Sequence, residues 1–251
     1  MAQTKVSAQW LETYQQNYGS GPSQWRWLGA LDKAHNIETL CQDLSISSVI
    51  DIGAGEGSIL KALSDRGFAD RYYALEITPT AIAEIETRDI PGLVECSIFD
   101  GYEIPYGDKQ FDLAVLSHVV EHAEHPRSLL YEAQRIAKYV FIEVPLEDNI
   151  RLSRNYVYDG LGHINFYSIK TIRRLAQTCD FKVLDHKVTN KSKVVYTFRH
   201  GYKGLMMYYV KQFLLRLSPA LATRLFTFHS AMVCESSVGA QDAEQSTAAS
   251  S

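Results

Sequence analysis

Short apolar runs alternate with helix-like patterns along the chain from Ser48 to about Val144. Strands separated by helical segments are typical of βαβ units and a parallel sheet. The pattern therefore predicts an α/β fold of the Rossmann-like, doubly wound type with a mostly parallel sheet. Five candidate strands lie in this region: Ser48–Ile52, Arg71–Glu76, Leu93–Ile98, Phe111–Ser117 and Tyr139–Val144.

Two further strands are expected after this region, which makes a seven-stranded sheet. The first is Phe181–Val188, and the last lies near Phe226–Cys234. Between them, Gly204–Leu217 is strongly apolar and is followed by a Ser-Pro pair, which is typical of one helix ending and another beginning. This segment predicts a helical insert over about residues 200–224, before the last strand.

The ends of the chain differ in composition from its centre. Trp10–Leu44 has a helical and aromatic pattern, so residues 1–47 are expected to form a helical cap that covers a ligand or packs onto the core. Residues 48–235 are expected to form the catalytic domain. Residues 236–251 are small and polar, which predicts a disordered tail.

Cysteine usage and hydropathy indicate where the protein works. The four cysteines are far apart and include no CxxC pair, so neither a disulfide framework nor a zinc knuckle is expected. The first residues contain no apolar leader, and no run reaches the ~18 apolar residues that would span a bilayer. A reduced, cytoplasmic protein is the expectation.

A glycine-rich turn follows the first predicted strand, in the sequence VIDIGAGEG at residues 49–57. Glycines allow positive φ angles and a close approach of the backbone to a ligand, and the next helix presents free N–H groups. The spacing is GxGxG, because Ser58 stands where the dinucleotide fingerprint needs its third glycine. A nucleotide-type cofactor without a pyrophosphate is favoured over NAD.

Glu76 ends the second predicted strand, twenty-three residues after Gly53. An acid ~20 residues beyond such a turn binds ribose hydroxyls in this class of fold, and its charge would repel a 2′-phosphate. The spacing indicates an adenosine-containing cofactor and disfavours NADP.

Four ordered blocks of sequence carry a family resemblance: VIDIGAGEG, YYALEI, FDGYEIPYGDKQFDLAVLSHVVEH and FIEVP. With them, the chain from about Val49 to Tyr167 resembles the class I S-adenosylmethionine-dependent methyltransferases of the type 11/23 group, which is similar to the ubiquinone/menaquinone methyltransferases. The resemblance implies S-adenosyl-L-methionine as the cofactor. Methyl transfer from its sulfonium is an in-line displacement, so no metal is expected.

The resemblance also implies roles for individual residues. Asp51, Gly53 and Gly55, with Ala54 between them, would surround the methionine part of the cofactor. Glu76 would bind the ribose, with Ile77 beside it. Asp100 would bond the adenine amino group, with Gly101 beside it, and Ser117 and His118 would line the boundary between cofactor and acceptor. The residues of this implied set stand in the sequence as Asp51, Gly53, Ala54, Gly55, Glu76, Ile77, Asp100, Gly101, Ser117 and His118.

Two histidines are candidates for the group that removes a proton from the acceptor, because imidazole titrates near neutrality. His118 follows the fourth strand, and His163 lies in a loop after the fifth. His163 has a second interpretation as a structural residue that caps the next helix. The run from His118 to His122 also matches the HxxEH zinc pattern, which is the minority interpretation here.

We expect the reaction to be methyl transfer to an O or N atom of a small acceptor. Alternatives are a C-methyltransferase of a quinone-like lipid, a protein or RNA methyltransferase, and a non-catalytic cofactor-binding module. The Asn-Pro-Pro-Tyr type of motif of many nucleic-acid base methyltransferases is missing after the fourth strand, so no nucleic acid partner is expected.

The charge distribution suggests a surface on the acceptor side. The net charge is −4, yet His186–Cys234 contains eight cations and no acid, which leaves −12 on the remainder. Either acids elsewhere neutralise these cations, or an external anion does. The segment is expected to meet an anionic or lipid-linked acceptor, or an anionic membrane face through residues 199–216. Its apolar residues would serve equally as a homodimer seam.

Overall fold

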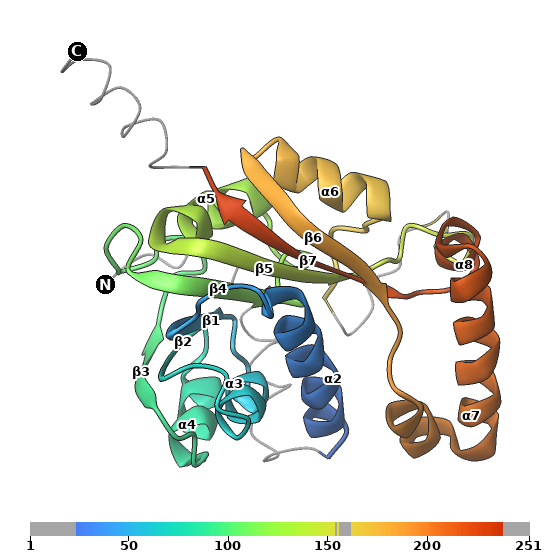
Figure 1. Ribbon diagram of the computed structural model, residues 1–251, viewed down its shortest axis with the longest axis horizontal. Coiled ribbons are helices and arrows are strands. Elements are labelled where there is room, and N and C mark those ends of the chain that lie inside the picture. Colours follow the sequence, from blue (N-terminus) through green and yellow to red (C-terminus); the bar gives the residue numbers. More distant parts are fainter. Residues whose placement is uncertain (1–23, 154, 156–161, 238–251) are drawn as a thin grey trace.

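The computed structural model describes residues 24–153, 155 and 162–237. They form a seven-stranded sheet with the strand order β3-β2-β1-β4-β5-β7-β6 (Figure 1). The first five strands pair in parallel, and β7 runs antiparallel to both of its neighbours. The predicted α/β architecture is confirmed, including the number of strands.

The strand bounds agree closely with the hydrophobic pattern. The strands are β1 (Ser48–Ile52), β2 (Arg71–Glu76), β3 (Leu93–Ile98), β4 (Phe111–Ser117), β5 (Ala137–Pro145), β6 (Phe181–Thr189) and β7 (His229–Ser236). The last strand begins three residues later than expected and extends to Ser236. Its pairing with β5 starts where His229 lies opposite Pro145, so the antiparallel register decides where β7 begins.

Helices cover both faces of the sheet. They are α2 (Gln24–Cys41), α3 (Ser58–Ser64), α4 (Pro79–Thr87), α5 (Pro126–Ile136), α6 (Ile169–Gln177), α7 (Lys193–Leu217) and α8 (Pro219–Leu225). One core cluster contains buried residues of α2, α3 and α4, and the other contains those of α5, α6 and α8. Two cores divided by one sheet are what a doubly wound fold requires.

Side-chain caps fix the helix starts that position the site. Thr78 accepts a bond from the backbone N–H of Ala81 at 3.4 Å, ahead of the proline that begins α4. Ser168 and Thr171 form a capping box at the start of α6. The structure therefore gives the capping role at α6 to Ser168, so His163 does not cap this helix.

The helical insert begins earlier than the apolar pattern suggests. The side chain of Ser192 accepts from the N–H of Val195 and caps α7, which begins at Lys193, seven residues before the expected boundary at position 200. The helix then kinks at Gly201, where φ is 55° and ψ is −139°, a conformation that side chains disfavour. Figure 1 shows α7 standing at one side of the molecule, with α8 returning the chain to β7.

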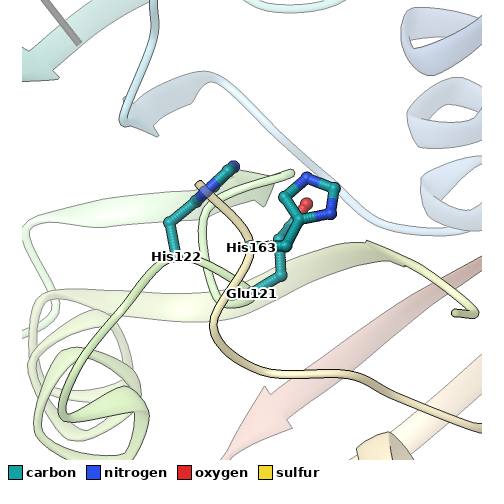
Figure 2. A group of neighbouring side chains, drawn as sticks. All are labelled: Glu121, His122 and His163. Atoms are coloured by element: carbon teal, nitrogen blue, oxygen red, sulfur yellow. The ribbon is translucent and has the colours of Figure 1, made fainter. Parts of the chain in front are cut away.

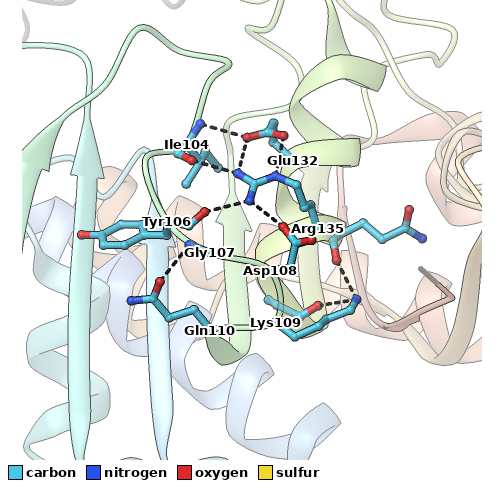
Figure 3. A network of polar contacts seen from close by, with 10 residues as sticks. Ile104, Tyr106, Gly107, Asp108, Lys109, Gln110, Glu132 and Arg135 are labelled. Atoms are coloured by element: carbon cyan, nitrogen blue, oxygen red, sulfur yellow. Dashed lines mark hydrogen bonds and ion pairs between the residues drawn. The ribbon is translucent and has the colours of Figure 1, made fainter. Parts of the chain in front are cut away.

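Arg135 of α5 holds the loop between β3 and β4 against the sheet (Figure 3). Its guanidinium donates to the carbonyl oxygens of Ile104 at 2.9 Å and Tyr106 at 2.7 Å, and pairs with Glu132 at 2.7 Å. The carboxylate of Glu132 in turn accepts from the N–H of Ile104 at 3.0 Å. This network fixes the loop that follows the third strand's carboxyl end.

All four cysteines are free, as their spacing predicts. Within the described ranges, no helix is long and apolar enough to cross a bilayer. The described helix of the predicted cap is α2, whereas residues 1–23 and most of the expected tail, 238–251, lie outside the described residues.

Candidate active site

The glycine turn after β1 has the backbone that its sequence predicts. Gly53, Gly55 and Gly57 have φ angles of 76°, 59° and 74°, in the left-handed region that favours glycine. A Cβ atom on Gly53 would lie only 2.7 Å from Cγ2 of Val119 in the loop after β4. The N–H groups of Gly53 and Ala54 both donate to the carbonyl of Leu75, which ties the turn to β2.

The Glu76 side chain turns back onto this glycine turn. Its carboxylate accepts from the N–H of Gly55 at 2.7 Å and from the N–H of Ile77 at 2.8 Å. Burial raises the pKa of Glu76, and these backbone bonds oppose that rise. Each oxygen keeps acceptor capacity beyond these bonds, which suits the recognition of two hydroxyl groups.

Asp51 is buried at the end of β1 without a partner for its charge. Among the described residues, neither carboxylate oxygen accepts a hydrogen bond, although the residue is only 1% exposed. Burial raises the pKa of Asp51 to about 7, with Lys33 opposing the rise. A buried, unsatisfied carboxylate is costly unless a donor or cation reaches it.

A cavity of about 100 Å³ opens beside these residues at the carboxyl ends of four parallel strands. Five of the expected site residues line it: Gly53, Glu76, Ile77, Gly101 and His118. Phe99, Tyr102, Val119 and Leu129 add walls that the sequence did not single out, and His122 of the HxxEH run lines the cavity as well. Ligands of open α/β sheets bind at this edge.

Two other expected site residues, Asp100 and Ser117, form hydrogen bonds with other groups of the protein. Asp100 caps its own turn, because its Oδ1 accepts from the N–H groups of Tyr102 at 2.8 Å and Glu103 at 2.6 Å. Its neighbours Phe99 and Gly101 line the cavity. Ser117 donates from its hydroxyl to Oε2 of Glu143 at 3.1 Å.

His118 has a strained backbone and a buried nitrogen. Its φ angle is 61°, a left-handed value that is uncommon outside glycine and concentrates at functional sites. Nδ1 lies 3.0 Å from Oε1 of Glu121, whereas Nε2 is buried and accepts or donates no hydrogen bond among the described residues. Burial holds the pKa of His118 well below its usual value, so the imidazole is neutral.

Glu143 and His229 join the site although the sequence reasoning missed them. Glu143 is fully buried in β5 and accepts from Asn36 at 2.9 Å as well as from Ser117. His229 begins β7, with Nδ1 3.9 Å from Oε1 of Glu143 and its ring 4.8 Å from that of His118. An acid inside the apolar strand FIEVP was the available signal for Glu143.

His163 is not among the described residues that line this cavity, but it contacts His122, which is. Its Nδ1 bonds Oε2 of Glu147 at 2.7 Å, and its ring lies 4.8 Å from that of His122, which does line the cavity. Nδ1 of His122 bonds the carbonyl oxygen of Gly162 at 2.9 Å. The loop after β5 therefore packs against the loop after β4.

Three of these side chains converge closely enough to ligate a cation (Figure 2). One ligand atom each from Glu121, His122 and His163 lies within 4.8 Å of the others. The set differs from the HxxEH pattern, which places its two histidines one turn apart on a helix. Here His118 and His122 lie in a turn before α5, and His118 is not in the cluster.

Comparison with known proteins gives the family. The profile of a family described as "Methyltransferase domain" matches residues 26–186, so the chain belongs to that family. A curated relative, an uncharacterised protein of Methanocaldococcus jannaschii, is 26% identical over 102 residues, which cover 41% of this chain. The match spans 45% of that relative's length.

Solved structures repeat the fold at low sequence identity. The cyclase SpnF is 14% identical with a TM-score of 0.62, over 88% of this chain and 86% of its own. A putative methyltransferase in complex with the Haloferax volcanii activator Trm112 is 17% identical with a TM-score of 0.58, over 82% and 88%. A SAM-dependent methyltransferase of Methanosarcina mazei is 14% identical with a TM-score of 0.53, over 78% and 96%.

Fold and family together define a class I S-adenosylmethionine-dependent methyltransferase, an enzyme whose cofactor is S-adenosylmethionine. The resemblance read from the four sequence blocks is confirmed.

Proposed function

We propose that this enzyme transfers the methyl group to an O or N atom of a small acceptor, and that His118 receives the acceptor's proton. The observation that carries the proposal is the Nε2 atom of His118, buried at the cavity wall without a hydrogen-bond partner in the described part of the chain. A neutral imidazole with an unprotonated ring nitrogen is a competent base for a hydroxyl or ammonium group.

The cofactor supplies an activated methyl group on a sulfonium, and the protein orients both reactants. Asp51 would balance the positive charge of the methionine end, and Gly53, Ala54 and Gly55 would let the backbone pass close to it. Glu76 and Ile77 would hold the ribose, with Asp100 and Gly101 at the adenine and Ser117 on the acceptor side. In-line displacement needs alignment and exclusion of water.

Glu121 would set the orientation of His118. Oε1 of Glu121 lies 3.0 Å from Nδ1, so a protonated His118 would gain an ion pair with this carboxylate. Glu121 is fully buried, so its charge is poorly solvated until His118 gains a proton. Burial lowers the pKa of His118 and raises that of Glu121, so an ionised Glu121 would offset part of the cost of a proton on His118. His163 would support proton transfer from behind, through His122.

No metal is needed for this reaction. The sulfonium leaves as a neutral sulfide, so the displacement does not require a Lewis acid. The cluster of Glu121, His122 and His163 would then act as a polar brace between two loops. Each histidine is already oriented through Nδ1, by Glu147 or by the carbonyl of Gly162.

We further propose that the exposed face of α7 contacts an anionic membrane surface, where a lipid-linked acceptor would be presented. Apolar side chains recur along one face at helical spacing: Tyr202, Met206, Tyr209, Phe213 and Leu217, all between 54% and 75% exposed. Lys203 and Arg216 are exposed beside them. Amphipathic helices with cations beside an apolar stripe bind anionic interfaces.

Calorimetry with S-adenosylhomocysteine, followed by transfer of labelled methyl groups to hydroxyl and amine acceptors, tests the main proposal. Binding followed by transfer to an O or N atom supports it. Transfer only to carbon acceptors would favour the quinone-like alternative, and binding without any transfer would favour a non-catalytic module.

A further inference from the structure

A second cavity, of about 190 Å³, is lined by residues that follow β6, by residues of α7 and by residues at the start of β7. One water molecule needs only about 10–15 Å³ of such space, so this cavity admits a much larger group. Its walls come from the β6–α7 connection, from two turns of α7 and from the start of β7. They include Lys191, Tyr196, Arg199, Lys211, Phe228 and His229.

The walls are positively charged. Lys191, Arg199 and Lys211 line the cavity from three separate positions in the chain, with no Asp or Glu among its described lining residues. Burial lowers the pKa of Lys191 most, and the positive charges of Arg199 and Lys33 lower it further. Cations that destabilise one another around an open space form a site for an anion.

Lys211 is the clearest sign of a missing negative charge. Residues 199–216 were expected to face an anionic surface, but Lys211 among them is only 7% exposed and lines this cavity. Its Nζ donates to the hydroxyl of Tyr196 at 2.5 Å and to the carbonyl of Thr227 at 2.6 Å, both neutral oxygens. A buried ammonium without a counter-charge is unfavourable.

Nearby acids are committed elsewhere. Asp32 accepts from the N–H of Ser192 at 2.7 Å, and Glu147 bonds His163. Both lie close enough to raise the pKa of Lys191, although burial and Arg199 outweigh them. Protein acids therefore compensate the cavity's cations only in part.

The cavity also adjoins the reaction centre. His229 lines it, and the His229 ring packs edge to face against His118, which lines the cofactor-side cavity. A group held by the lysines would thus place the rest of the same molecule next to His118.

We infer that this cavity binds a phosphate group carried by the methyl acceptor, with Lys191, Arg199 and Lys211 as its ligands. The inference rests on the proposed methyl transfer and narrows its substrate class to phosphorylated acceptors, either soluble or lipid-linked. Phosphate accepts several hydrogen bonds and carries the charge that three converging cations require.

Calorimetry with inorganic phosphate tests the inference on the full chain. The variant Lys191→Gln/Arg199→Gln removes two cations of the cavity, and we expect phosphate affinity to fall at least tenfold. Lys187→Gln/Arg224→Gln removes two exposed cations of the same acid-free segment outside the cavity, and its affinity should match wild type. Lys211 is left unchanged because its bonds also support the fold.

Binding of S-adenosylhomocysteine is measured on the same samples and should be equal in all three proteins. Two results would overturn the cavity inference and leave the methyltransferase proposal standing, provided that S-adenosylhomocysteine binds. One is that wild type does not bind phosphate, and the other is that the two double variants bind phosphate with equal affinity. If S-adenosylhomocysteine itself fails to bind, the proposed function fails first.

Vesicles distinguish the two sources of phosphate. If phosphatidylglycerol vesicles bind wild type but do not bind the Lys191→Gln/Arg199→Gln variant, the cavity holds a lipid phosphate. Vesicle binding that is equal for the two proteins, together with the tenfold loss for inorganic phosphate, would identify a soluble phosphorylated acceptor.

Discussion

The imidazole rings of His118 and His229 lie edge to face, with centroids 4.8 Å apart and planes at 86°. His118 lines the cavity beside the glycine turn, and His229 lines the cavity that contains the cations Lys191, Arg199 and Lys211. Burial holds the pKa of both histidines well below the usual value, so both rings are neutral. The walls of the two cavities therefore meet at this pair of rings.

Glu76→Ala and Gly55→Val should each weaken binding of S-adenosylhomocysteine at least tenfold. The first removes a carboxylate whose bonds to hydroxyl groups are worth about 1.5–3 kcal/mol each. The second places a branched side chain at a φ of 59° in a turn that must approach the ligand. Calorimetry gives the affinities, and Glu95→Ala, on the exposed neighbouring strand β3, is the control. Unchanged affinity in both variants would remove the assignment of this turn to the cofactor.

His118→Asn should lower kcat by about 10²–10⁴-fold, the usual range for loss of a positioned base, and leave affinity for S-adenosylhomocysteine within about twofold. Asparagine tolerates the left-handed backbone of this position, so the substitution removes the base with little strain. His163→Ala is expected to lower kcat as well, by less, because it acts through His122. His35→Asn, exposed on α2, is the control. If the His118→Asn and His163→Ala variants both keep the wild-type kcat, proximity or another base is sufficient for the reaction.

Anionic vesicles should co-sediment with the protein at low salt and release it at high salt, because electrostatic docking is screened. Lys203→Gln/Arg216→Gln should weaken binding, since each cation near such a surface contributes about 1 kcal/mol. Phe213→Ser should weaken it by removing an apolar side chain that is 67% exposed. Absence of vesicle binding combined with a concentration-dependent dimer in ultracentrifugation would assign this face to a second copy.

Chelation should leave methyl transfer unchanged, because the proposed reaction uses no metal. The measurement is turnover before and after dialysis against EDTA, with metal content determined by mass spectrometry. Retained activity in metal-free protein supports the proposal. Activity that falls on dialysis, returns with a divalent cation and stays absent in His122→Ala would instead make Glu121, His122 and His163 a functional metal site.

The stability of wild type relative to Lys211→Met should rise with pH. Burial, with Lys191 and Arg151 nearby, lowers the folded-state pKa of Lys211 from 10.5 to about 8, so between these values only the unfolded chain holds the proton. Linkage then predicts a relative gain of about 2 kcal/mol from pH 7 to 9.5. Urea unfolding of both proteins in phosphate-free buffer measures it. A difference that is flat across this range would show that the lysine titrates normally when folded.

Local sequence determined most of the fold. Short apolar runs between helical patterns gave strand bounds that match β1 to β4 at both ends. The glycine turn and Glu76 were likewise readable, because their spacing follows from one βαβ unit and needs no distant contact. In the described structure these residues do share one cavity edge.

Tertiary structure decided which distant residues meet. Glu143 was hidden in an apolar strand and His229 in the last one, and they meet His118 only because β5 lies between β4 and β7. Lys211 lies in the segment 199–216 that was expected to meet a membrane face, yet it is buried and lines a cavity. Sequence periodicity records which face of an element is apolar, but not which other element will cover it. Strand order and helix packing supply that information, and here they convert an acid-free stretch of sequence into a cavity lined with cations beside the reaction centre.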